Sequence, residues 1–435
     1  MTSVQFVNAA GVPGSVAPRP APLSAVLFVT FMNSLGTGVV TSGIYFLTQQ
    51  GYGFTQTQNY LLGLMLGATY IAGSLGAQPA LAWVRKRFPT VSTRFVLIGL
   101  MVTMAALCAL PVIAGKIDGP GRSAVGVASI WVLVAVYSPL TGVFWPIIES
   151  YLSGARSGDP LRRAIGLWNV TWASALVVAA WAIAPAIKDY AAETIFVLGG
   201  VHLLTVPFMA GLSREPASHR EEHHEAHPPV YSALLVTFRM LLPVIYLIAS
   251  ALSPYLPTAL TDLGVPPVWH TVLGSAWLLP RALAFFILMQ WQGWHGRWST
   301  AIVSGVLILV GFGVAVMAPT LPRLGVSNAT SVVVLVSGLA VYGLGKAAVY
   351  MAALYYGLAV GKSEVQAGGK HEALIGCGYT IGPACGLAAT AAVNSGVLEP
   401  SWFNAAVLGT VGFLTVGVAV AVAMRVRRMS GKQSA

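Results

Sequence analysis

The feature that most constrains this chain is a repeated block of apolar sequence, each block about as long as a bilayer is thick. A transmembrane helix needs roughly 20 predominantly apolar residues, and short polar joints separate a succession of such blocks. With 56% hydrophobic and only 9% charged residues, a water-soluble fold would have too little polar surface. The sequence therefore predicts an all-α polytopic protein in a lipid bilayer.

Twelve spans are predicted, and their even number places both termini on one side of the membrane. The spans are 23–48, 58–83, 94–114, 124–152, 164–185, 191–212, 233–259, 268–291, 299–318, 330–360, 372–396 and 402–424. The longest polar break falls between the sixth and seventh spans. This divides the chain into a tail 1–22, a six-helix bundle 23–212, a linker 213–232, a six-helix bundle 233–424 and a basic tail 425–435.

The placement of Lys and Arg predicts the orientation, because basic residues close to spans stay in the cytoplasm. Most of the 24 basic residues fall on the side of the N-terminus. The other side holds only Lys116, Arg122, Lys188 and Arg323. Both termini are therefore expected to be cytoplasmic, with the bacterial inner membrane as the expected location. The net charge of +11 reflects this topology, and its scatter over many loops argues against nucleic-acid binding.

The linker 213–232 is rich in His and Glu and admits two interpretations. It holds His219, His223, His224 and His227, so it could bind a divalent cation or sense pH. We favour a solvated linker without a metal, which is usual for a charged, Pro-flanked segment. The cysteines fall within spans, so neither a disulfide nor a metal site is expected, and no cofactor is predicted.

Two six-span halves joined by a long central loop resemble the major facilitator superfamily. The signature of that family lies between the second and third spans. Here that loop keeps the basic cluster Arg85, Lys86 and Arg87 but lacks the family's Asp and Gly. The corresponding loop between spans eight and nine ends in Gly296 and Arg297, which look like the end of the signature. The resemblance implies two pseudo-symmetric bundles that rock around a central cavity.

A second element of the family matches more closely, in the eleventh span. Gly378, Gly382, Pro383 and Gly386 look like the family's G-x-x-x-G-P-x-x-G element, which is usual in the fifth span of drug and proton antiporters. In the eleventh span the element predicts close helix packing and gives little support for antiport.

Two cations fall near the middle of predicted spans, where an ionisable residue is a functional hypothesis by default. Lys346 shares a helical face with Tyr342 and Tyr350, and the resemblance places its span against the cavity. Arg281 lies one turn from Trp277, so its guanidinium could stack on the indole or clamp an anion. A fixed structural pairing remains open for both cations. A positive interior favours an anionic solute.

Glu149 is the one acid that we place inside a span, near the end of span four. It could carry a proton as the cavity alternates, but we favour a latch to Arg156, Arg162, Arg163 or the basic cluster of loop two to three. His371 and Glu372 are placed at the entry to span eleven, as capping or gating residues. The sequence therefore predicts no pair of carboxyl groups within the membrane.

Polar residues of span one are further candidates for the cavity. Asn33, Thr37 and Thr41 recur on one helical face, although such residues more often bond a neighbouring helix.

The motifs that are absent from the sequence narrow the function. No G-x-x-x-x-G-K-[ST] phosphate loop and no H-E-x-x-H pair or nucleophile elbow occurs, which disfavours ATP-driven export and an enzyme. The leading prediction is a monomeric secondary transporter that moves a small, anionic organic solute with a proton or other coupling ion. The alternatives are a uniporter or symporter for a neutral sugar or metabolite, and a non-transporting sensor that uses the His-rich linker.

Overall fold

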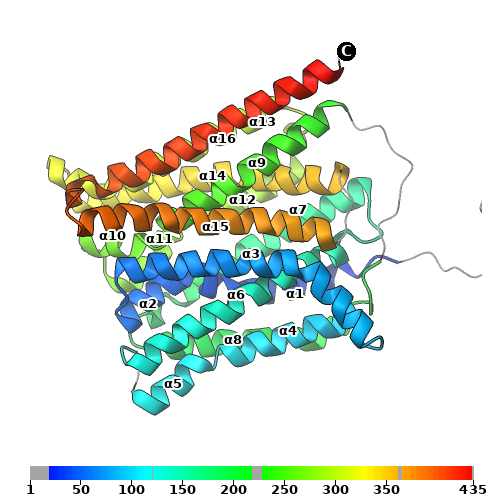
Figure 1. Cartoon of the computed structure of the whole chain (residues 1–435), viewed down its shortest axis with the longest axis horizontal. Helices are drawn as coiled ribbons and strands as arrows, with labels where there is room; N and C mark the ends of the chain where they lie inside the picture. Colours follow the sequence, from blue (N-terminus) through cyan, green and yellow to red (C-terminus); the bar gives the residue numbers. More distant parts are fainter. Residues whose placement is uncertain (1–18, 120, 218–227, 361–364, 434–435) are drawn as a thin grey trace, which may run out of the picture.

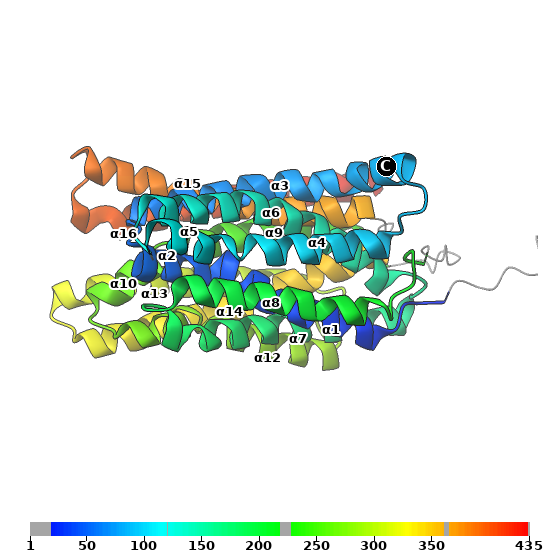
Figure 2. The ribbon, with the colours of Figure 1, turned by 90° about the horizontal axis from the view of Figure 1, so that it is seen from below.

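The computed structural model describes residues 19–119, 121–217, 228–360 and 365–433, which form one elongated bundle of helices (Figure 1). Turned by 90°, the bundle again shows helices running along its long axis (Figure 2). Every regular element among the described residues is helical, and twelve helices are long and apolar enough to cross a membrane. The predicted all-helical, twelve-span architecture is confirmed. The four linker histidines and tail residues 1–18 lie outside the described residues.

The first half of the chain supplies eight α-helices and two shorter helical turns. They are α1 (Leu23–Gly38), the π-helical turn η1 (Val39–Gly43), α2 (Ile44–Tyr52), α3 (Gln56–Arg87), α4 (Thr93–Leu107), α5 (Leu110–Asp118), α6 (Ala124–Ser153), α7 (Gly158–Ala182), η2 (Ala184–Ala186) and α8 (Ala191–Met209). The chain runs through η1 without a break, so α1, η1 and α2 make a single span.

The second half supplies eight further α-helices and three short 3-10 helices. They are α9 (Val230–Leu252), α10 (Leu256–Asp262), η3 (Pro267–Trp269), α11 (His270–Gly274), α12 (Leu278–Gln290), α13 (Trp298–Met317), η4 (Ala318–Leu324), α14 (Asn328–Val360), α15 (Val365–Asn394), η5 (Pro400–Trp402) and α16 (Phe403–Gln433). The helix α16 thus continues through the predicted tail 425–435 as far as Gln433.

Short polar joints begin several spans by satisfying free backbone N–H groups. Thr55 and Gln58 form a capping box at the start of α3, and the hydroxyl groups of Ser92 and Ser123 accept backbone N–H groups at the starts of α4 and α6. In lipid such partners are needed, because no water is available to bond these groups.

Four predicted spans differ from the structure. Span three is interrupted between α4 and α5. Span seven is interrupted between α9 and α10, where Pro254 follows Ser253, and span eight is interrupted between α11 and α12. Span eleven begins at Val365 instead of residue 372, so Glu372 lies about two turns inside the helix. The sequence Gly368-Gly369-Lys370 resembles a loop, but both glycines belong to the helix.

Glycine lets the two halves of the chain approach at backbone distance along α3 and α15. These helices lie side by side in Figure 1, and an added Cβ at Gly67 would lie 2.5 Å from the backbone of Tyr379 and Thr380. On its other side α15 meets α9, where a Cβ at Gly382 would overlap the carbonyl oxygen of Leu247. Close approach of this kind maximises dispersion contacts where lipid provides no hydrophobic drive.

Two glycines of α3 provide a matched test of this packing. A Cβ at Gly73 would overlap the carbonyl oxygen of Pro139 on α6, whereas a Cβ at Gly76 meets no atom within 4 Å. We expect Gly73→Ala to lower the free energy of unfolding by about 1–3 kcal/mol, because backbone atoms must move apart. Gly76→Ala should leave it unchanged or slightly raised. Thermal unfolding in detergent measures both, and equal midpoints for the two variants would contradict the packing argument.

Candidate functional site

A cavity of about 70 Å³ lies where both halves of the chain meet. Its walls come from α1, η1, α3, α6 and α7 in the first half and from α9, α14 and α15 in the second. Seven of the lining side chains are aromatic, namely Tyr70, Trp145, Trp168, Trp172, Tyr246, Tyr350 and Tyr379. A space of this size holds a few water molecules, so an organic solute would need the halves to move apart.

The polar part of the cavity wall consists of hydroxyl groups of span one, together with Thr141 of α6 and the carboxyl group of Glu372 on α15. Thr37 and Thr41 line the cavity, and each donates its hydroxyl to a carbonyl one turn earlier in its own span, at 3.0 and 2.6 Å. Asn33 is fully buried and does not line this cavity, and both polar atoms of its amide lack a hydrogen-bond partner. Thr41 lies within η1, and π-helical turns of this kind are frequent at functional sites.

Arg281 on α12 is held between two indole rings at the border of the halves. Its guanidinium carbon lies 4.4 Å from the ring centre of Trp172 on α7 and 4.6 Å from that of Trp277. The side chain is 1% exposed, and its Nε and Nη2 atoms have no hydrogen-bond partner. Cation–π contact stabilises a desolvated guanidinium by roughly 2 kcal/mol, but the hydrogen-bond donors remain available to an acceptor.

Lys346 on α14 has a similar aromatic environment. Its Nζ lies 4.1 Å from the ring centre of Tyr246 and 4.3 Å from that of Trp277, and the side chain is 1% exposed. The hydroxyl of Tyr342, one turn earlier, donates a hydrogen bond to the carbonyl oxygen of Ile245. Trp277 therefore contacts both cations. Neither cation lines the cavity directly, but Trp172 and Tyr246, which contact them, do.

The predicted cavity tyrosine Tyr350 lies at the centre of this aromatic cluster. Its ring meets Trp172 at 5.1 Å and His371 at 5.9 Å between ring centres. It therefore contacts both the aromatic surroundings of Arg281 and the residues around Glu372.

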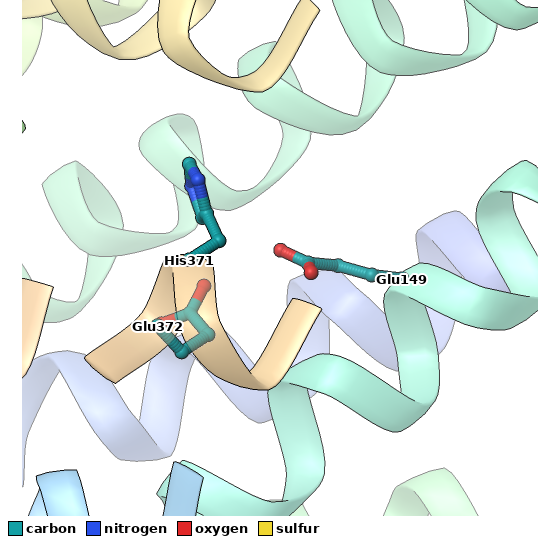
Figure 3. A group of neighbouring side chains, drawn as sticks. All are labelled: Glu149, His371 and Glu372. Carbon is teal, nitrogen blue, oxygen red and sulfur yellow. The ribbon is translucent and has the colours of Figure 1, made fainter. Parts of the chain in front are cut away.

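Glu149, His371 and Glu372 form a cluster (Figure 3). They lie on the last turns of α6 and the first turns of α15, near the end of the bundle where α1 begins (Figure 1), which we call the terminal end. A carboxyl oxygen of each glutamate and a ring nitrogen of His371 all lie within 4.8 Å of one another. Both carboxyl side chains are 3% exposed. The hydroxyl of Tyr70 on α3 donates a hydrogen bond to Glu372. Glu149 and Glu372 come from opposite halves, on α6 and α15.

This cluster corrects two predictions made from the sequence. Two carboxyl groups do meet inside membrane-length helices, because α15 begins earlier than predicted and carries Glu372 inward. The favoured latch of Glu149 to a nearby arginine is wrong as well. Arg156 donates to the carbonyl oxygens of Tyr151, Leu152 and Ala21, and Arg162 pairs with Asp159 at 2.8 Å.

Comparison with known proteins identifies the architecture. No protein-family model matches the sequence, and no curated protein is significantly similar to it. Solved structures match over nearly the whole chain. The human organic anion transporter MFSD10 (TETRAN) is 13% identical with a TM-score of 0.60, over 91% of this chain and 98% of the other. The nucleoside transporter NupG is 12% identical with a TM-score of 0.57, over 93% and 98%.

The chain has the major facilitator fold. Its two signature loops can therefore be located in that fold. Arg85 pairs with Glu215 at 2.8 Å and donates to the hydroxyl of Thr93 at 3.1 Å. The family signature has an Asp in the loop between the second and third spans, and this loop lacks it. Arg85 instead pairs with an acid that follows α8 in the chain.

The remaining signature residues lie at the same end of the major facilitator fold. Lys86 is exposed, and Arg87 stacks on Phe88 at 5.5 Å. Gly296 adopts a φ of 68° and donates its N–H to the hydroxyl of Tyr356 at 2.9 Å. Arg297 is the N-cap residue of α13.

The glycine element of α15 packs on both sides. Added Cβ atoms at Gly378 and Gly382 would overlap α9, one at Gly386 would overlap the ring of Tyr60 on α3, and Pro383 lies against Gly63 of α3.

The Arg85–Glu215 contact makes a testable prediction on pH. Burial would raise the pKa of Glu215, but hydrogen bonds from Thr93 and the charge and hydrogen bond of Arg85 outweigh it and lower the pKa below 4.5. An acid whose pKa is lower in the folded state stabilises that state above the unfolded pKa, and the effect is lost as pH falls through the folded pKa. We therefore expect Glu215→Gln to lower the unfolding temperature at about pH 7, and the difference from the wild type to vanish as the pH falls through the folded-state pKa of Glu215. The exposed Glu193→Gln is the control, and a difference for Glu215→Gln that persists in acid would contradict the assignment.

Proposed function

We propose that the protein is a secondary transporter that moves a small organic anion by alternating access, coupled to or exchanged for protons. The chain is proposed to act as a monomer in a bacterial inner membrane with both termini in the cytoplasm. Energy then comes from an ion or solute gradient. The solute would enter the aromatic cavity when one end of the bundle opens, and the hydroxyl groups of span one would contribute polar contacts.

The observation that carries this proposal is the pair of buried cations without an acid beside them. Among the described residues, the ion pairs are Arg85–Glu215 and Arg162–Asp159, so neither Arg281 nor Lys346 is neutralised by a carboxylate. Burying an uncompensated charge costs several kcal/mol. An anionic group that reached Trp277 would neutralise this charge and accept the free donors of Arg281. The arrangement supports a carboxylate or phosphate as the charged part of the solute.

The aromatic walls support an organic solute over a simple inorganic anion. Trp168 and Trp172 give broad apolar surfaces, and Trp172 is itself oriented by a hydrogen bond from its Nε1 to Asn169 at 2.8 Å. Rings stack on planar or apolar groups, while a few polar atoms fix orientation. Glu149 is the proposed proton carrier, because its buried carboxyl group has an atom without a hydrogen-bond partner.

The structural neighbours support transport in general. One is described as an organic anion transporter and the other as a nucleoside transporter. The second suggests a neutral solute as the alternative, and one observation favours it. The direct lining of the cavity contains hydroxyl and aromatic side chains and the carboxyl group of Glu372, but neither Lys346 nor Arg281. In that case the two cations would have a structural role.

An anionic and a neutral solute should respond differently when the charge of Arg281 or Lys346 is removed. Ligand-induced thermal stabilisation of the purified protein, screened with benzoate, succinate and uridine, reports binding without knowledge of the solute. For an anionic solute, we expect Arg281→Gln and Lys346→Gln each to weaken binding roughly 10–100-fold, the usual effect of losing one charged hydrogen-bond partner. The exposed Lys188→Gln is the matched control. Flux into liposomes then tests transport of whichever compound binds.

Each outcome has a definite consequence. Stabilisation by an anion that both variants lose supports the proposal. Stabilisation by uridine alone, unchanged in both variants, would replace the anion with a neutral solute.

A further inference from the structure

Two carboxyl groups join the halves of the protein at the terminal end. Glu149 belongs to α6 and Glu372 to α15, and Figure 3 shows the carboxyl of Glu149 directed toward the turn of α15 that carries His371 and Glu372. Oε1 of Glu149 has no hydrogen-bond partner, although the residue is 3% exposed. Glu372 accepts the hydroxyl of Tyr70. An unpartnered buried carboxyl oxygen beside a second carboxyl indicates that a small ligand belongs between them.

Among the residues that the structure describes, no ion pair neutralises the two carboxyl groups. His371 lies beside Glu372 on α15, Tyr70 faces it from α3, and Tyr350 on α14 interacts with both acids. On α9, Arg239 acts electrostatically on His371. Neither ion pair of the described residues involves Glu149 or Glu372. Two ionised carboxylates at this separation repel each other strongly out of water, so one proton shared between them removes the repulsion.

The first turns of α15 pack closely against α6 and α3 beside this site. A Cβ added at Gly368 would lie 2.8 Å from Oε2 of Glu149, and one at Gly369 would lie 2.5 Å from the carbonyl oxygen of Ser74 on α3. The two glycines thus let α15 approach α6 and α3 together. If the helices separated, this contact would be lost and water would reach both carboxyl groups.

We propose that Glu149 and Glu372 together form the binding site for a single proton, and that the site exists only while the terminal end is closed. The protonated carboxyl donates a hydrogen bond to the ionised one, which Tyr70 also supports. When α6 and α15 separate, both carboxylates become hydrated and the proton leaves to water on that side. The inference deepens the proposed function and rests on it only for the link between proton and solute.

The test measures closure of the terminal end against pH, without any solute. Spin labels are attached through Arg163→Cys on α7 and Gln366→Cys on α15, both exposed positions, after Cys108, Cys377 and Cys385 are replaced by Ala. Double electron–electron resonance in nanodiscs then gives the distance distribution. We expect the short-distance population at low pH to give way to a longer one as pH rises. For one linked proton, the ratio of open to closed protein changes by at most about tenfold per pH unit.

Variants identify the groups that bind the proton. Glu149→Gln and Glu372→Gln each replace a carboxyl with an amide that donates without a proton, so both should stay closed across the pH range. Glu193→Gln, an exposed acid at the opposite end, should keep the wild-type transition. A wild-type distance that ignores pH, or glutamine variants that retain the transition, would overturn the proposal.

Two further outcomes name a different site. Loss of the transition in His371→Gln alone would make the imidazole the titrating group. Since two carboxyl groups and an imidazole also suit a divalent cation, a transition abolished by EDTA would make the ligand a metal. Either result would overturn the proton pair. Anion binding and flux are measured separately, so their failure would refute the proposed function and leave the distance measurement to decide the pair.

Discussion

Backbone approach between α3 and α15 is the contact on which the arrangement of this protein most depends. These helices belong to opposite halves, and glycines on both of them, including Gly67 and Gly386, remove the side chains that would hold them apart. In lipid the gain comes from dispersion and from satisfied polar groups. The same contact brings Tyr70 of α3 to Glu372. Under the proposed function, helix packing and proton binding would share this interface, so opening it would change both.

Buried charge is distributed unequally around the central cavity. The cations Arg281 and Lys346 both belong to the second half and are covered by rings, with Trp172 reaching Arg281 from the first half. The acids Glu149 and Glu372 are divided between the halves. A rocking motion would therefore uncover Arg281 by moving Trp172 away, and would separate the acids from each other. Each change alters the cost of burying a charge.

The sequence predicts the number of spans well, because the thickness of the bilayer sets the length of each transmembrane helix and apolar blocks of that length are visible in the sequence. It also points to Lys346 and Arg281 as buried cations, since cations in apolar blocks are rare and conspicuous. It fails at Glu372, because Gly368 and Gly369 look like a boundary when the helix that they pack against is not known. It also cannot show that Trp172 covers Arg281, which requires α7 and α12 to be neighbours across the halves. The local sequence pattern shows which residues each helix contains, whereas the site is formed by contacts between helices that are distant in the sequence.

The cation cluster and the acid pair are connected by a continuous series of contacts. Lys346 lies over Tyr246, the rings of Tyr246 and Tyr379 meet at 5.0 Å, and those of Tyr379 and Tyr70 meet at 5.9 Å. Tyr70 then bonds Glu372. Under the proposed function, an anion at the cations and one proton at the acids would each cancel a buried charge. A cavity that has to close around its contents favours the state in which both are bound, because closure removes the water that would otherwise stabilise the uncancelled charges. Binding of the two would then be coupled through the common cost of closing the bundle, with the tyrosines as the shared wall.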